Sequence, residues 1–378
     1  MFFKTNLYAI LFKSKVVGAP AMKTLCIDAR MAFSSGIGTC IRQLVPYFNQ
    51  PPFRVILLVG KKAQVWCDGI EQIHFSSPIY SVKEQISFPL KIPSCDLFWS
   101  PHYNIPLLPI RAKKRIVTIH DACHLALGQF FSKMERFYAR TVMHAALHRS
   151  DRVVTGSLFS KIELLRFLGK PKRDLKVIPI GVNRDRFRQV AEPFVIEKVR
   201  RKYQLPEKFI LYVGNLKPHK NLSGLLQAFE RLSLPDLGLV LVGKNQGLRN
   251  SIGNISANRV FELGEIPEED LPVLYSLAEL FVFPSFYEGF GLPPLEAMCC
   301  GCPTVVSNAA SLPEVCGDAS LYFRPEQPHE IAESIFKVLS DDILREKIIR
   351  TGFERVDRFN WAETARKYRE MFEEIAYA

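Results

Sequence analysis

The chain has 378 residues, 48% of them hydrophobic, and a formal net charge of +12. This length exceeds what one hydrophobic core usually supports, so at least two domains are expected. Nine cysteines, an odd number scattered through hydrophobic runs, exclude a disulfide framework and indicate buried thiols in a reducing compartment. Cys299, Cys300 and Cys302 are bunched, but the second ligand pair of a zinc site does not follow them, so we expect no metal centre.

The N-terminal segment MFFKTNLYAILFKSKVVGAPAM is basic and apolar. Its longest uncharged run, TNLYAILF, has eight residues, whereas a transmembrane helix needs roughly 20. Two interpretations remain open. Either translation starts at Met22, or residues 1–21 form an amphipathic extension that lies on a membrane. We favour the first.

Short apolar runs rich in β-formers recur along the chain, with helical stretches between them. The first series comprises residues 24–28, 54–60, 97–100, 115–120, 152–157 and 175–181, and the second comprises 209–214, 237–243, 260–266, 279–285 and 303–308. Strands that alternate with helices predict parallel sheets covered on both faces. We therefore expect an α/β protein with two doubly wound domains, at 22–190 and 207–357, joined by a linker at 191–206.

The charge is divided unevenly between the two halves of the chain. Residues 1–190 hold 29 Lys and Arg against 11 Asp and Glu, a net of +18, and the remainder holds 21 against 27, a net of −6. The first half should therefore face an anionic partner. Nucleic acid is not favoured, because stacking aromatics are not interleaved with the basic residues and no recognition helix or zinc finger is evident. An anionic membrane surface or glycolipid fits better.

Two loops of the first half follow strands, where doubly wound sheets bind their ligands. Gly36 and Gly38 open a helix and would let backbone amides approach a phosphate or sugar, although a plain tight turn remains the alternative. A dinucleotide fingerprint is excluded because Ile41 stands where the third glycine belongs. His120 and Asp121 follow residues 115–119, so that His120 either contacts a substrate hydroxyl or has a structural role.

The third loop begins at Gly214 and reads GNLKPHKN. Lys217, His219 and Lys220 lie between a strand and a helix that should start near Asn221. Cationic side chains beside a helix N-terminus form an anion site suited to a diphosphate. Ordinary exposed loop lysines remain the alternative.

The fourth loop lies in the stretch PSFYEGFGLPPLEAM, residues 284–298. Two carboxylates, Glu288 and Glu296, stand in a run that is otherwise aromatic, aliphatic, glycine or proline, so both need a polar partner. Between them lie Gly289, Phe290, Gly291 and Leu292. We expect Glu288 on the loop and Glu296 in the first turn of the helix, where a carboxylate accepts both hydroxyls of a ribose while free amides hold phosphate.

These segments together resemble glycosyltransferase family 4, the retaining enzymes of the GT-B fold, and in particular bacterial mannosyltransferase-like members. The two glutamates with seven residues between them are similar to its E-x7-E motif. The resemblance covers nearly all of the chain from Met22, in SGIGTCIRQL, VTIHD, RSDRVVTGSLFSK, VIPIGVNRDRF, YVGNLKPHKN and SNAASLPEVCGDASLYF.

The resemblance implies two Rossmann-like domains facing each other across a crevice, with a final helix at 358–378 that returns to the first domain. By similarity, Glu296 would bind the donor ribose, Glu288 the donor sugar and Lys220 the diphosphate. Gly38 would pack at the phosphate, and His120 would face the transferred sugar. The candidate catalytic residues are thus His120, Glu288 and Lys220.

One position departs from the family pattern. His219 stands where the family usually has an arginine, so the diphosphate would be neutralised more weakly or with help from Lys217.

The implied reaction transfers a hexose, at first guess mannose from GDP-mannose, to a glycan or lipid-linked acceptor in cell-envelope polysaccharide synthesis. A UDP-linked donor stays open. No cofactor or metal is expected, in line with the absence of Asp-x-Asp from the sequence, and the expected location is the cytoplasm, including the inner face of the membrane. A nucleotide-sugar epimerase of the same architecture and a non-catalytic polysaccharide- or membrane-binding protein are the alternatives.

Overall fold

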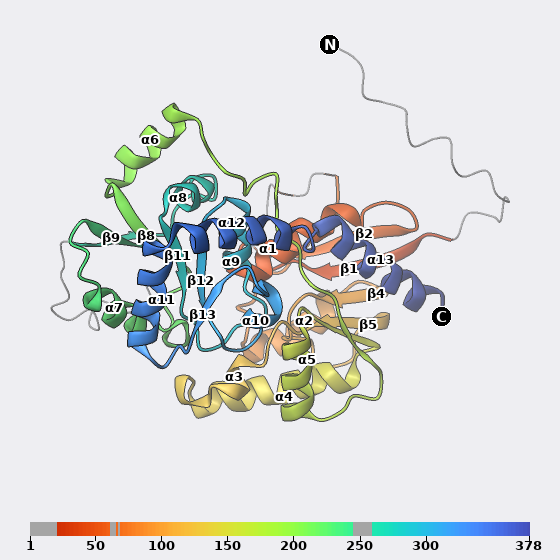
Figure 1. Ribbon diagram of the computed structural model, residues 1–378. Coiled ribbons are helices and arrows are strands. Elements are labelled where there is room, and N and C mark those ends of the chain that lie inside the picture. The colour runs from red at the N-terminus through yellow and green to blue at the C-terminus, as the bar shows by residue number, and fades with distance from the viewer. Residues whose placement is uncertain (1–20, 61–65, 67–68, 245–258) are drawn as a thin grey trace, which may run out of the picture.

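The computed structural model describes residues 21–60, 66, 69–244 and 259–378, and these form two parallel sheets (Figure 1). The first sheet has seven strands in the order β3-β2-β1-β4-β5-β6-β7. They are β1 (Lys23–Asp28), β2 (Phe53–Val59), β3 (Glu71–His74), β4 (Cys95–Ser100), β5 (Ala112–Thr118), β6 (Arg152–Thr155) and β7 (Leu175–Val177). The prediction of a doubly wound α/β fold is confirmed.

The second sheet has six strands in the order β10-β9-β8-β11-β12-β13. They are β8 (Lys208–Val213), β9 (Leu237–Val242), β10 (Val260–Gly264), β11 (Leu280–Phe283), β12 (Thr304–Ser307) and β13 (Leu321–Phe323). Both sheets reverse their strand order between the first and fourth strands of their own series, beside β1 and β4 and beside β8 and β11. Ligands of such sheets bind at the carboxyl ends of the strands at these switch points.

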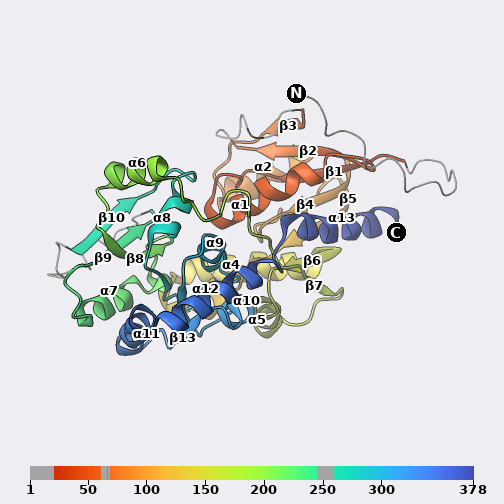
Figure 2. The ribbon, with the colours of Figure 1, turned by 45° about the horizontal axis from the view of Figure 1, so that its top comes forward.

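Helices cover both sheets, as Figure 2 shows. They are α1 (Ser35–Leu44), α2 (Val82–Lys91), α3 (Cys123–Ala126), α4 (Lys133–Arg149), α5 (Leu158–Leu168), α6 (Pro193–Tyr203), α7 (Leu222–Arg231), α8 (Leu271–Leu277), α9 (Leu292–Cys299), α10 (Leu312–Cys316), α11 (Pro328–Ser340), α12 (Asp342–Val356) and α13 (Trp361–Tyr377). Across the described ranges, no helix is both long and apolar enough to cross a bilayer. The eight described cysteines are free and buried, and Cys67 lies outside the described residues.

The expected linker at 191–206 contains helix α6, which belongs to the second domain. The Lys202 ammonium and the Tyr203 hydroxyl both bond to the Asp270 carboxylate at 2.6 Å, just before α8. Pro193 near the start of α6 is the reason for the difference, because a proline is tolerated in the first turn of a helix as readily as in a linker.

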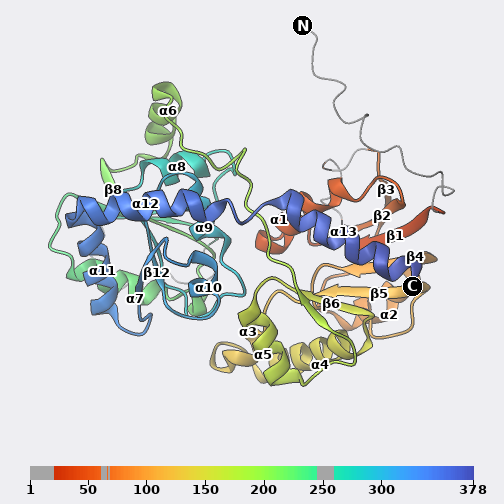
Figure 3. The same cartoon turned by 45° about the vertical axis from the view of Figure 1, so that its right-hand side comes forward.

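The last helix, α13, lies on the first sheet (Figures 1 and 3). Its Tyr368 and Phe372 rings pack on Trp99 of β4, with ring centroids 5.2 and 5.6 Å apart. The Tyr368 hydroxyl also hydrogen-bonds the Thr118 hydroxyl of β5 at 3.0 Å. A single cluster of buried side chains therefore continues from the first sheet through α13 into the second domain.

We expect Phe372→Ala to lower the free energy of unfolding by about 3–5 kcal/mol, because it leaves a cavity under a fully buried ring. Chemical denaturation monitored by circular dichroism measures the change. Phe336→Ala, at a ring that is 53% exposed on α11, is the matched control and should cost far less. Equal losses for the two variants would contradict the packing of α13 described above.

Candidate active site

Two loops of the second domain meet at its switch point, where β8 and β11 end. The first loop closes with a short 3-10 turn over Pro218–Lys220, and the second carries Glu288. The Phe286 amide donates to the His219 carbonyl at 2.9 Å, which joins the two loops through the backbone. The predicted basic loop and the predicted glutamate loop are therefore adjacent.

Lys220 and Glu288 form an ion pair at this junction. The Lys220 Nζ donates to both carboxylate oxygens of Glu288, at 2.6 and 2.8 Å. The two side chains are only 18% and 11% exposed. Each charge compensates the other where solvent access is limited, so a ligand that brings its own anion can compete with Glu288 for the ammonium.

His219 is not a cation near neutral pH. Burial, together with the positive charges of Lys220 and Lys217, lowers its pKa to about 3. Its ring lies against Phe131 of the first domain, with centroids 6.5 Å apart. The positive charge of this loop therefore comes from the two lysines, and the arginine position of the family pattern is filled by a neutral ring.

Glu296 lies on α9, whose N-cap is Gly291 and whose first residue is Leu292. It is the fifth residue of the helix, so its expected place in the first turn is wrong. The helix begins at Leu292 because Gly291 adopts a left-handed conformation, with φ at 102°, and the helix starts directly after it. The carboxylate accepts a hydrogen bond from the Tyr275 hydroxyl of α8 at 3.1 Å.

Burial raises the pKa of Glu296 to about 7, against the lowering effect of the Tyr275 hydroxyl. The Glu268 carboxylate raises this pKa further and the Arg186 guanidinium opposes it. The side chain keeps some contact with solvent. Because its pKa is about 7, the carboxylate is close to half-ionised at neutral pH. Tyr275 was missed from the sequence, where the only signal was that a carboxylate in an apolar helix needs a partner.

His120 follows β5 on the opposite side of the crevice. Its Nε2 donates to the Pro101 carbonyl at 2.8 Å, so the neutral ring presents Nδ1 as an acceptor. Burial lowers the pKa of His120, which favours this neutral form. The sequence predicted the place of His120 at a strand end, but the Pro101 contact that orients the ring links segments 19 residues apart.

Gly289 brings the two domains into contact at His120. A Cβ at Gly289 would lie 2.4 Å from the His120 carbonyl oxygen, so only glycine fits there. The Ser157 hydroxyl donates to the Gly289 carbonyl at 2.7 Å. The Ser160 hydroxyl donates to the carbonyls of Gly289 and His120, both at 3.0 Å. The catalytic candidates from the two domains thus lie on loops that touch.

A second contact between the domains lies nearby. Glu314 of α10 accepts hydrogen bonds from the Leu158 and Phe159 amides at the start of α5, at 2.8 and 3.0 Å. A carboxylate at a helix N-terminus is favoured by the helix dipole. Sequence analysis missed Glu314 and the two serines, because each acts on a residue more than 120 positions away.

The remaining predicted residues, three glycines and Phe290, have different surroundings. Gly38 is buried, and a Cβ there would meet the Ala32 carbonyl oxygen at 2.5 Å, whereas a Cβ at the exposed Gly36 would meet open space among the described residues. The Gly214 amide donates to the Val242 carbonyl at 2.9 Å. The Phe290 ring packs edge-on against Phe359, with centroids 5.6 Å apart.

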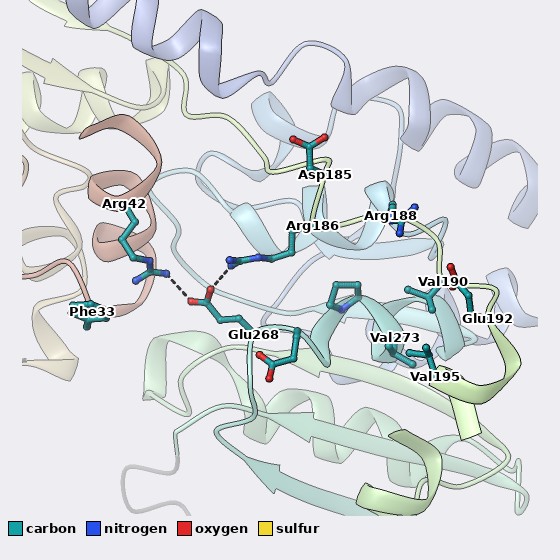
Figure 4. Close-up of a pocket in the computed structure, with 12 residues that line it drawn as sticks. Phe33, Arg42, Asp185, Arg186, Arg188, Val190, Glu192, Val195, Glu268 and Val273 are labelled. Carbon is teal, nitrogen blue, oxygen red and sulfur yellow. Dashed lines mark hydrogen bonds and ion pairs between the residues drawn. The ribbon is translucent and has the colours of Figure 1, made fainter. Parts of the chain in front are cut away.

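A cavity of about 740 Å³ lies beside the Glu296 region, between α1, the segment 185–195 and α8 (Figure 4). Across its mouth, Glu268 bonds to Arg42 of the first domain at 2.7 Å and to Arg186. The cavity is large enough for a small molecule. Neither Lys220 nor Glu288 lines it, so it is distinct from their ion pair.

The pKa of Glu296 leads to a prediction for GDP binding. If the carboxylate accepts ribose hydroxyls, affinity should rise about tenfold between roughly pH 6 and pH 8, as the group ionises through about 7. Isothermal titration calorimetry with GDP measures this. Glu296→Gln keeps the shape of the side chain but cannot titrate. The pH dependence of its GDP affinity should therefore be smaller and should come from ionisation of the GDP phosphates alone. Identical pH profiles for the parent and Glu296→Gln would remove Glu296 from ribose binding.

Gly289→Ala should separate the two loops, because the added methyl cannot lie 2.4 Å from the His120 carbonyl. We expect turnover to fall on the order of 100-fold, since displacements near 1 Å have effects of this size. Gly60→Ala is the control, because its Cβ would lie 3.7 Å from the nearest atom. Unchanged turnover in Gly289→Ala, measured as nucleotide release from a donor, would show that this contact is not needed.

This chain is similar in sequence to known glycosyltransferases. Residues 195–355 match the family described as glycosyl transferases group 1. The chain is 35% identical over 263 residues to the O-antigen chain mannosyltransferase B of Escherichia coli, covering 67% of this chain and 68% of that protein. It is 37% identical over 181 residues to the serotype-specific mannosyltransferase WbdA of Escherichia coli, covering 45% of this chain and 22% of that longer protein.

Among solved structures, sucrose-phosphate synthase from Thermosynechococcus elongatus superposes with a TM-score of 0.75 over 94% of this chain and 99% of that one, at 22% identity. This likeness shows the GT-B fold. The 35% identical relative supports the glycosyltransferase over the epimerase and the non-catalytic alternatives. The chain belongs to the glycosyl transferases group 1 family and is a glycosyltransferase.

Proposed function

We propose that the protein is a retaining mannosyltransferase that moves mannose from GDP-mannose to a glycan or lipid-linked glycan acceptor of cell-envelope polysaccharide. The observation that carries the proposal is the Lys220–Glu288 pair at the crevice, 2.6 Å between Nζ and Oε1. Both groups meet a donor at its reacting end, one at the phosphate and one at the sugar. The mannosyltransferase relatives support mannose as the sugar.

The leaving group determines the chemistry of the proposed step. The bond between the anomeric carbon and the β-phosphate oxygen breaks, which leaves a sugar with oxocarbenium character and a diphosphate with one more negative charge. Lys220 moves from Glu288 to this oxygen and stabilises the developing charge, and Lys217 adds a second cation. Neutral His219 leaves the two lysines as the source of that stabilisation in the loop.

The acceptor hydroxyl attacks on the face from which the diphosphate departs. Its oxygen forms the new bond to the anomeric carbon, and its proton passes to the leaving phosphate oxygen, so the configuration at that carbon is retained. Glu288, released by Lys220, accepts hydrogen bonds from hydroxyls of the transferred sugar. The Nδ1 atom of neutral His120 accepts another from the opposite side of the crevice.

Glu296 holds the nucleoside end of the donor. Its carboxylate accepts the two ribose hydroxyls, and the Tyr275 hydroxyl orients it. The backbone at Gly36 lies beside the phosphates, since that glycine has room for a ligand next to it. The basic first half of the protein faces the acceptor at an anionic membrane surface on the cytoplasmic side.

The donor is identified by incubating the protein with GDP-mannose, GDP-fucose, UDP-glucose and UDP-galactose together with an extract of lipid-linked glycans. We expect GDP release and labelled glycan only with GDP-mannose, and NMR of the product should show retained anomeric configuration. A nucleotide sugar that changes configuration while its diphosphate bond stays intact would indicate an epimerase. Inversion of the anomeric carbon would contradict the proposed mechanism.

Lys220→Ala should lower kcat more than it weakens GDP binding, because the charge that it neutralises grows toward the transition state. Loss of one such electrostatic group costs roughly 100- to 1,000-fold in turnover. Steady-state kinetics and GDP titration, together with the melting temperature, separate these effects. Lys337→Ala, on the exposed face of α11, is the control. A variant with parental kcat would remove Lys220 from the mechanism.

A further inference from the structure

Helix α2 carries an apolar stripe on its exposed face. Val82, Ile86 and Leu90 are spaced four residues apart and are 79%, 61% and 79% exposed. At this spacing they line one side of the helix, while Glu84 and Phe88 are buried on the other. Three consecutive apolar positions on the solvent side of a helix need an explanation that folding of this chain does not provide.

The first turns of α4 continue this stripe. Met134 is 82% exposed and Phe137 is 75% exposed. The Gln85 side-chain amide of α2 donates to the Tyr138 hydroxyl of α4 at 3.2 Å, so the two helices are neighbours. Met134 lies one turn before Tyr138, just as Val82 lies one turn before Gln85. The two neighbouring helices therefore both expose apolar side chains to solvent; we call Val82, Ile86, Leu90, Met134 and Phe137 the α2–α4 patch.

The rim of the α2–α4 patch is cationic. Exposed basic side chains flank it on both helices: Lys83, Lys91, Lys133, Arg136 and Arg140.

Helices α2 and α4 carry one carboxylate each, and both have partners. The Glu84 carboxylate is buried in an ion pair with Arg30 at 2.7 Å. The exposed Glu135 carboxylate is bonded to the Ser132 amide and hydroxyl at the start of α4. The rim therefore presents net positive charge around an apolar centre.

We propose that the α2–α4 patch docks on an anionic lipid bilayer, with its apolar side chains inserted at the headgroup level and its basic rim against the lipid phosphates. An apolar centre with a basic rim is the pattern of helices that lie in a membrane interface. The charge complements anionic lipid. A protein partner or a second copy of the chain would have to present an acidic rim of matching shape.

The α2–α4 patch is separate from two other basic stretches of the first domain. The runs Arg111–Arg115 and Lys170–Arg173 lead into β5 and β7, at the amino ends of the strands and away from the crevice. Two of their cations have carboxylate partners there, with Lys113 bonded to Asp96 at 2.8 Å and Arg173 to Asp151 at 2.5 Å. Helix α4, in contrast, starts after the loop that carries His120, along the lower edge of the first domain in Figure 3.

A series of aromatic rings leads from the α2–α4 patch to the donor loop. Tyr80 contacts Tyr138 beside the patch and Tyr103 at 5.9 Å. Tyr103 contacts His124 at 5.9 Å, and His124 stacks on Phe131 at 4.3 Å between centroids. Phe131 then meets His219. A lipid-linked acceptor held at the membrane would reach the crevice along this path; that link, unlike the docking itself, rests on the proposed function.

The test is sedimentation of the full chain with vesicles of phosphatidylcholine, with and without about one third phosphatidylglycerol, at low and high salt. Ile86→Ser/Phe137→Ser should lower the bound fraction on anionic vesicles on the order of tenfold. Phe194→Ser/Ile343→Ser, at side chains 82% and 83% exposed on α6 and α12, is the matched control and should bind like the parent. The melting temperature of the parent and of each variant shows whether the protein is folded.

The charge contribution is measured with Lys133→Gln/Arg140→Gln. This variant should lose binding to anionic vesicles roughly fivefold per cation and should bind neutral vesicles like the parent. Parental binding by the Ile86/Phe137 variant would overturn the proposal, as would an equal loss in the Phe194/Ile343 control. A dimer in solution that this substitution dissociates, without an effect on vesicles, would also overturn it by identifying an interface between copies.

Turnover of GDP-mannose in the absence of vesicles separates this inference from the proposed function. The Ile86/Phe137 variant should keep parental turnover, because the α2–α4 patch lies outside the residues of the site. If no protein in the set turns over GDP-mannose, the proposed function fails, while the vesicle result still decides whether the patch docks on lipid.

Discussion

The contact between Gly289 and the backbone of His120 is the constraint on which the site depends. The glycine carbonyl takes hydrogen bonds from two serines of the first domain, and its Cα approaches the His120 carbonyl too closely for any side chain. The shared core that continues through α13 holds the domains in the same arrangement. Because Glu288 directly precedes Gly289, this contact also sets how far Glu288 lies from the His120 side of the crevice.

The charged side chains of the site are compensated within the protein. Lys220 and Glu288 neutralise each other in a region of limited solvent access, and Glu296 stays partly protonated near neutral pH. A diphosphate sugar would replace both arrangements, since it supplies an anion for the lysine and hydroxyls for the two carboxylates. The charges of the site thus compensate one another within the protein and are placed to respond to a ligand.

Much of the fold could be predicted from the sequence, because buried parallel strands leave continuous apolar runs. Each of the runs noted in the sequence overlaps a strand of the structure, from residues 24–28 to 303–308. The two strands that were missed are β3, which reads EQIH, and β13, which has three residues. Both lie at sheet edges, where a strand is covered less and its sequence is under weaker hydrophobic constraint.

The sequence indicated which loops form the site. It did not indicate which side chains of these loops contact one another. The sequence pattern indicated that Glu288 needed a polar partner, but its partner in the structure is Lys220, 68 positions away. The neutral state of His219 arises from burial and from its neighbouring lysines, which only a folded chain displays. The start of α9 at Leu292 depends on the left-handed conformation of Gly291, which places Glu296 beyond the first turn.

A crystal structure with GDP bound tests the central claim most directly. We expect the Lys220 ammonium to leave Glu288 and to lie about 2.7–2.9 Å from a β-phosphate oxygen, with Glu296 at hydrogen-bond distance from both ribose hydroxyls. GDP bound instead against Arg42 and Arg186 in the neighbouring cavity, with the Lys220–Glu288 pair still intact at 2.6 Å, would contradict it.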